Sequence, residues 1–135
     1  MKSSFYRAVG AALLLAVSFG SQAASLPNFG KLEERLKIRP EQKEQYDATI
    51  ASTQRALFSV ALVAMQLKDN LAREFAKPRP DFKALAREHE ALIEQTRPLF
   101  KEAGEEWKKL YAQLDDEQVE IAKSFLRENL GRLLQ

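Results

Sequence analysis

Residues 41–76 read EQKEQYDATIASTQRALFSVALVAMQLKDNLAREFA, a stretch without proline or glycine. Apolar and small side chains recur in it at alternating steps of three and four residues, at Tyr46, Ile50, Thr53, Leu57, Val60, Ala64, Leu67, Leu71 and Phe75. This spacing gathers them on one face of an α-helix, which favours packing against another long helix. Pro40 suits the first helical position, so the sequence predicts one helix of about 35 residues from there to Ala76.

The segment Lys77-Pro78-Arg79-Pro80 ends this helix, because two prolines in three residues cannot continue it. A second long helix begins near Asp81, whose side chain suits an N-cap. Its inner seam consists of Phe82, Leu85, His89, Leu92, Thr96, Leu99, Ala103, Trp107, Leu110 and Leu114. Pro98 falls inside this seam without shifting its phase, so we expect a kink near Pro98 rather than a reversal of the chain.

Two shorter helices flank this hairpin. Residues 29–36 suit a short first helix, and Leu114-Asp115-Asp116-Glu117-Gln118 starts a last helix of about 18 residues with Asp115 as its N-cap. The sequence therefore predicts an all-α fold: a short first helix, a long antiparallel helical hairpin whose second helix is kinked, and a C-terminal helix.

The N-terminal residues have the three parts of a secretory signal. Lys2 and Arg7 are followed by an apolar run from Ala8 to Phe19 and by small residues up to Ala24. The run has about 12 residues, fewer than the ~20 that a membrane-spanning helix needs. We predict that residues 1–24 are a cleaved signal peptide and that residues 25–135 form one helical domain in the periplasm. The alternative is a retained membrane anchor; after cleavage we expect no membrane span.

Charge and composition narrow the function classes. Of the 21 basic residues, Lys2 and Arg7 lie in the predicted signal, whereas all 19 acidic residues follow it, so the mature chain is formally neutral. Neutrality removes the main support for nucleic-acid binding. The chain has no cysteine, so the domain relies on helix packing or on a partner subunit rather than on disulfides.

The sequence offers little catalytic chemistry. Its single histidine, His89, falls on the inner seam, where a packed residue is more common than a metal ligand. After the signal the only glycines are Gly30, Gly104 and Gly131, so no phosphate-binding loop is present. We therefore expect no enzyme activity, no cofactor and no metal site.

The stretch Ala56–Leu67 is apolar at ten of its twelve positions, more than one helix contact can bury. Besides the seam it carries a second stripe of Phe58, Leu62 and Met65, about 100° around the helix. Three alternatives remain for what covers this stripe: the flanking helices, a second subunit, or a client protein. Ile93 and Phe100, on an extra apolar stripe of the second long helix, are further candidates for a client or dimer surface.

Basic residues cluster where the two long helices meet. Arg73, Lys77, Arg79, Lys83 and Arg87 form a candidate basic tip, against Glu74 and Asp81. A basic tip beside apolar side chains suits an unfolded or acidic client, and a solvated hairpin end is the alternative.

Two helix starts share a pattern of an aliphatic residue, two variable residues and then Glu-Gln. The first is Ile38-Arg39-Pro40-Glu41-Gln42 and the second is Leu114-Asp115-Asp116-Glu117-Gln118. This pair resembles the repeated L-T-x-x-Q motif of the Spy/CpxP family of periplasmic proteins. The export signal, the mature length and the lack of cysteine are also similar to that family. The family's threonine is replaced by Arg39 in the first motif and by Asp115 in the second. Asp115 can still cap its helix, whereas Arg39 cannot.

The resemblance implies a four-helix protomer that pairs antiparallel into a thin, curved, cradle-like dimer. It also implies ATP-independent chaperone activity toward unfolded or misfolded envelope proteins. Some relatives inhibit the periplasmic domain of an envelope-stress sensor kinase, and others bind zinc. A regulatory partner of such a two-component sensor is therefore the second functional hypothesis, and a metal-responsive protein is the third.

Overall fold

The computed structural model describes residues 27–133, which form four helices joined by short connections. They are α2 (Phe29–Leu36), α3 (Pro40–Phe75), α4 (Phe82–Gln113) and α5 (Asp116–Leu133). The described part of the chain contains no strand, which confirms the all-α class and the predicted order of helices. The predicted signal peptide lies outside the described residues.

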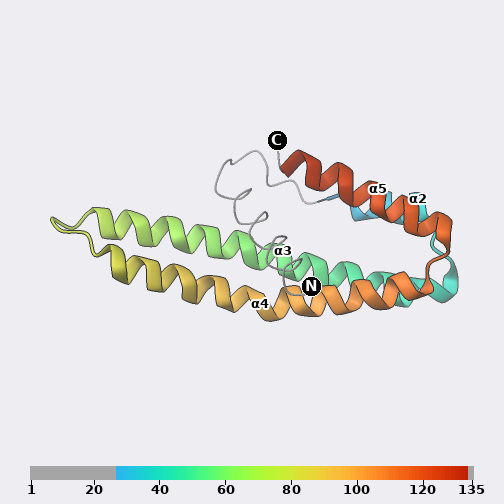
Figure 1. Cartoon of the computed structure of the whole chain (residues 1–135), viewed down its shortest axis with the longest axis horizontal. Helices are drawn as coiled ribbons and strands as arrows, with labels where there is room; N and C mark the ends of the chain where they lie inside the picture. The colour runs from blue at the N-terminus through green and yellow to red at the C-terminus, as the bar shows by residue number, and fades with distance from the viewer. Residues whose placement is uncertain (1–26, 134–135) are drawn as a thin grey trace.

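Helices α3 and α4 form a long antiparallel hairpin (Figure 1). With 36 residues, α3 is about 54 Å long. The contact between the helices buries Ala56, Val60 and Val63 of α3 and Thr96 and Ala103 of α4. As predicted, α4 runs through Pro98 as one helix, and it bends near its middle (Figure 1).

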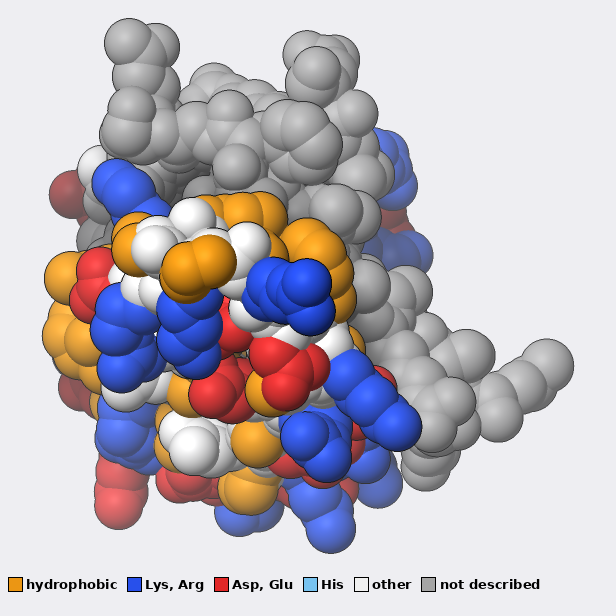
Figure 2. Space-filling model, turned by 90° about the vertical axis from the view of Figure 1, so that its left-hand side faces the viewer, with side chains coloured by type: hydrophobic (Ala, Val, Ile, Leu, Met, Phe, Trp, Pro, Cys, Tyr) orange, Lys and Arg blue, Asp and Glu red, His pale blue; other side chains and the backbone are white. Residues whose placement is uncertain are grey.

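At the tip of the hairpin, α3 and α4 extend beyond α2 and α5 (Figure 1). In Figure 1, α2 and α5 lie at the opposite end, so nothing in the described chain covers the outer sides of the distal half. The seam residues Leu71, Phe75, Phe82 and His89 are therefore exposed, and their prediction as inner residues is wrong. Figure 2 looks onto this end and shows hydrophobic atoms exposed among Lys and Arg side chains. Two helices bury small side chains between them, but the larger side chains near the tip stay in water because no third helix covers them there.

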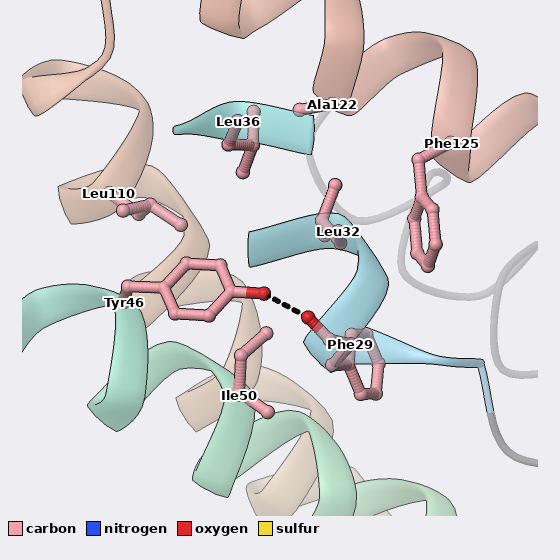
Figure 3. Close-up of a cluster of buried hydrophobic side chains, with 8 residues drawn as sticks. All are labelled: Phe29, Leu32, Leu36, Tyr46, Ile50, Leu110, Ala122 and Phe125. Carbon is pink, nitrogen blue, oxygen red and sulfur yellow. Dashed lines mark hydrogen bonds between the residues drawn. The ribbon is translucent and has the colours of Figure 1, made fainter. Parts of the chain in front are cut away.

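The hydrophobic core lies at the base of the hairpin, where α2 and α5 pack together beside α3 and α4 (Figures 1 and 3). It contains Phe29, Leu32, Leu36, Tyr46, Ile50, Leu110, Ala122 and Phe125. The Tyr46 hydroxyl donates a hydrogen bond of 2.6 Å to the carbonyl of Phe29, which ties α2 to α3 (Figure 3). Burial raises the pKa of Tyr46, so its hydroxyl stays protonated and keeps donating.

The helix ends follow local capping chemistry. The Asn28 side chain accepts from the Lys31 N–H at 3.0 Å, and Asp81 accepts from the Ala84 N–H at 3.0 Å, which confirms Asp81 as the N-cap of α4. Helix α2 is followed by its C-cap residue Lys37, whose backbone is left-handed with φ of 52°. That conformation terminates the helix and turns the chain into α3.

By length and composition α3 also qualifies as a helix that could cross a membrane, and 33% of its most apolar 18-residue stretch is buried. Its partner helix α4 carries many charges, including Glu90, Glu94, Arg97, Lys101, Glu102 and Glu105. The apolar character of α3 comes from a buried face and an exposed face on the same helix. The absence of a membrane span stays a prediction.

Candidate functional site

The two similar helix starts, 76 residues apart in sequence, meet in the structure. Gln42, in the first turn of α3, and Gln118, in the first turn of α5, are both buried and face each other. Each side-chain amide donates to the other's carbonyl oxygen at 3.0 Å. The predicted family motifs therefore form one contact, although nothing in their spacing requires it.

Each glutamine also makes two bonds to the backbone. Gln42 accepts from its own N-cap N–H of Arg39 at 3.0 Å and donates to the carbonyl of Gln113, at the end of α4, at 2.7 Å. Gln118 accepts from the N–H of Asp115 at 3.0 Å and donates to the carbonyl of Leu36, at the end of α2, at 3.0 Å. Every donor and acceptor of both amides is used, so the pair joins the ends of all four helices.

The second residues of the two helix starts, Arg39 and Asp115, interact with each other. Arg39 makes no side-chain cap bond, as expected; its guanidinium instead contacts a carboxylate oxygen of Asp115 at 3.2 Å. Asp115 also accepts from the Gln118 N–H at 2.8 Å, which confirms it as the N-cap of α5. That backbone bond, together with Arg39, lowers the pKa of Asp115, so the carboxylate stays charged.

The other motif residues surround this contact. Ile38 and Leu114 are half-buried against the core, whereas Pro40, Glu41 and Glu117 are exposed at the first turns of their helices. Glu41 accepts from the Arg39 Nε at 3.0 Å. These positions mark the motifs as a structural clamp rather than a solvent-facing site.

A row of hydrogen bonds between α3 and α4 continues from the clamp along the hairpin. The sequence alone did not predict these bonds. Gln45 donates to the Glu106 carboxylate at 2.7 Å, and the Thr49 hydroxyl lies 3.1 Å from the Glu106 carbonyl. The Trp107 indole donates to the Thr53 hydroxyl at 2.8 Å. The bond from Gln45, with help from Lys109, lowers the pKa of Glu106. Because these partners come from different helices, only the register of the packed hairpin reveals them.

The second apolar stripe of α3 is exposed. Phe58 is 63% exposed, Leu62 is 47% exposed and Met65 is 64% exposed, while Val60 and Val63 between them are buried against α4. The flanking helices of the described chain do not cover the stripe. This excludes the flanking helices and leaves a second subunit or a client protein as the alternatives. Ile93 and Phe100 of α4 are half-buried, so each presents only part of its side chain.

The five residues of the candidate basic tip lie around the turn between α3 and α4. All five side chains are exposed: Arg73, Lys77, Arg79, Lys83 and Arg87. Figure 2 shows Lys and Arg side chains gathered at this end of the hairpin. Glu74 is held between them: it accepts from the Asp81 N–H at 2.6 Å and pairs with Lys77 at 2.9 Å. That backbone bond and Lys77 lower the pKa of Glu74, so it remains a carboxylate that closes the turn.

A shallow groove of about 380 Å³ lies between the long helices beside this tip. Its lining is mostly apolar and consists of Leu67, Leu71, Phe82, Leu85, Ala86, His89 and Glu90. His89 is therefore a groove residue rather than a packed one. Within residues 27–133 no group of three or more histidine or acidic side chains is placed to hold a metal ion.

Comparisons with family models, with curated proteins and with solved structures found no match to this chain.

Proposed function

We propose that the protein is an ATP-independent chaperone of the periplasm, which holds unfolded or misfolded envelope proteins and limits their aggregation. The observation that supports this function is the exposed stripe of Phe58, Leu62 and Met65 on a helix whose other face is buried. Monomeric proteins rarely leave contiguous large apolar side chains in water unless something binds them. The resemblance of the two motifs to the Spy/CpxP family points the same way.

The stripe suits clients without a fixed shape. Phenylalanine gives contact area at little conformational cost, and methionine adapts to irregular surfaces. An exposed ion pair between Arg55 of α3 and Glu102 of α4, 2.9 Å long, lies one turn from Phe58 along α3 and adds charge of both signs. Affinity in the micromolar range, about −8 kcal/mol, would let clients leave without an energy source.

The test removes apolar area from the stripe. Phe58→Ser/Leu62→Ser is compared with wild type in suppressing the aggregation of reduced, unfolded α-lactalbumin, followed by light scattering. We expect the variant to need about tenfold more protein for equal suppression, which corresponds to a loss of about 1.4 kcal/mol in client binding. The matched control is Phe75→Ser/Phe82→Ser, which removes similarly exposed aromatic area at the tip and should suppress as well as wild type.

The resemblance also implies a homodimer, which could cover the same stripe. The solution mass of wild type and of both variants separates these roles. A Phe58→Ser/Leu62→Ser variant that becomes a monomer but suppresses aggregation fully would assign the stripe to the dimer interface and contradict its role in client binding. Unchanged mass with lost suppression is the expected result.

A further inference from the structure

The tip of the hairpin combines exposed aromatic rings with free positive charge. Phe75, the last residue of α3, is 59% exposed, and Phe82, the first residue of α4, is 61% exposed. Their rings stack edge to face with centroids 6.0 Å apart. They therefore form one apolar surface at the far end of the molecule, separate from the Phe58 stripe.

Two acidic groups of the tip are engaged in local bonds, and a third, Glu88, lies close enough to act on Lys77. Glu74 is bound by Lys77 and by the Asp81 N–H, and Asp81 caps α4. Among the residues that the structure describes, Arg79, Lys83 and Arg87 form no ion pair. Between residues 73 and 88 the five basic side chains outnumber the three acidic ones, so the tip presents a net positive charge around the aromatic pair to an external anion.

The shape favours a flat partner. The tip is convex, and the helices α2 and α5 lie at the opposite end of the molecule (Figures 1 and 2), so a planar surface can reach it without meeting the rest of the described chain. Aromatic rings prefer the headgroup level of a bilayer, and Lys and Arg are attracted to anionic lipids. Deeper insertion is opposed by the charges along α4, which a crossing hairpin would carry into the hydrocarbon.

We propose that this tip docks the protein onto a bilayer containing anionic phospholipid, with Phe75 and Phe82 at the headgroup level and Arg79, Lys83 and Arg87 against the phosphates. This inference does not depend on the chaperone proposal, since it concerns other residues. It would let the exposed stripe work close to a membrane surface.

Vesicle sedimentation tests the docking. The protein, in the form isolated from the expressing cell, is mixed with vesicles of phosphatidylcholine alone or of phosphatidylcholine and phosphatidylglycerol in equal parts. We expect binding to the anionic vesicles that weakens with added salt. All variants are compared in the same form, so any contribution of residues 1–26 is common to them.

Two kinds of variant isolate the tip. Arg79→Gln/Lys83→Gln should bind anionic vesicles roughly 30-fold more weakly, since each basic residue near the surface contributes about 1 kcal/mol. The control Lys101→Gln/Lys108→Gln removes the same charge from exposed positions elsewhere on α4 and should bind as wild type. Phe75→Ser/Phe82→Ser should also lose vesicle binding, whereas Phe58→Ser/Leu62→Ser should keep it. Circular dichroism confirms that each variant is folded.

A tryptophan at the tip reports its environment directly. In Phe82→Trp the emission should shift to the blue on addition of anionic vesicles, while the emission of wild type, whose single Trp107 lies in the half of α4 away from the tip, should not shift. Equal loss in the tip and control charge variants, or no binding to anionic vesicles, would overturn the proposal. Binding of the tip to soluble polyglutamate but not to vesicles would assign it to an acidic polypeptide instead.

Discussion

At the scale of single residues, the clamp between Gln42 and Gln118 depends on the amide groups of both side chains. Each amide offers two donors and one carbonyl oxygen, and the partners present are two backbone carbonyls, two backbone N–H groups and the other amide. A carboxylate has the same shape but no donor. The requirement is therefore for an amide, and burial makes it strict because water cannot replace a lost partner.

We predict that Gln42→Glu lowers the free energy of unfolding by at least about 2 kcal/mol at neutral pH. The new carboxylate would face the oxygens of Gln118 and Gln113, which repel it. Urea unfolding followed by circular dichroism measures the loss, and Gln54→Glu, at an exposed position of the same helix, should change stability little. Equal stability of the two variants would show that the amide pair does not stabilise the fold.

At the scale of the helices, the hairpin depends on a continuous α4 that contains a proline. Pro98 has no N–H, so the helical bond to the carbonyl of Glu94 is missing. The side chain of Pro98 is exposed, so packing does not require the ring. The bend of α4 (Figure 1) is the structural result of this missing bond and gives the long hairpin its curvature.

Replacing Pro98 by alanine should raise the free energy of unfolding by about 1–3 kcal/mol, because the N–H is restored and alanine favours a helix. Thermal and urea unfolding check this, and Gln95→Ala serves as a control at a neighbouring exposed position. A less stable Pro98→Ala variant would mean that the packing of α3 on α4 needs the bend. The small-angle scattering profile should show a straighter molecule.

At the scale of the whole molecule, the core and the two proposed binding surfaces are separated along one axis. The core and the glutamine clamp lie at the base, where four helices meet, and the exposed stripe and the tip lie on the two-helix arm (Figure 1). Substitutions on the arm should therefore change binding more than stability. This separation is what makes Phe58→Ser/Leu62→Ser and Phe75→Ser/Phe82→Ser usable as tests of function.

Three carboxylates that hold this architecture have lowered pKa values: Glu74 at the tip, Glu106 in the hairpin and Asp115 at the clamp. A group whose pKa is lower in the folded state than in the unfolded state stabilises the fold at pH values above its unfolded-state pKa. This stabilisation is lost as the pH falls through the folded-state pKa. We predict that these groups contribute a constant stabilisation at neutral pH. The free energy of unfolding should decrease as the pH falls below the ordinary pKa values of 4.5 for Glu and 3.8 for Asp.

Chemical unfolding at a series of pH values between neutral and about pH 3 measures this decrease. Asp115→Asn keeps an oxygen that can cap α5 but does not titrate, so its stability should fall less steeply in acid than that of wild type. A steeper fall in Asp115→Asn would contradict the assignment.

The sequence determined the helices of this protein, whereas the tertiary structure decided which of their faces are buried. Helix bounds, the caps Asp81 and Asp115 and the tip at Pro78 and Pro80 follow from interactions within a few residues, which the order of the chain specifies. Burial depends on which element covers a face. The same seam that is buried at Tyr46 is exposed at Phe75, because the short α2 and α5 cover only the base.

The clamp shows the same limit. The two motifs could be recognised as similar helix starts, but their contact across 76 residues depends on where α2 and α5 return to the hairpin. The pairing of Arg39 with Asp115, and of Gln45 with Glu106, likewise needs the register of packed helices. Local sequence fixes backbone conformation through short-range hydrogen bonds and sterics, while partners distant in sequence are chosen by the packing of the whole chain.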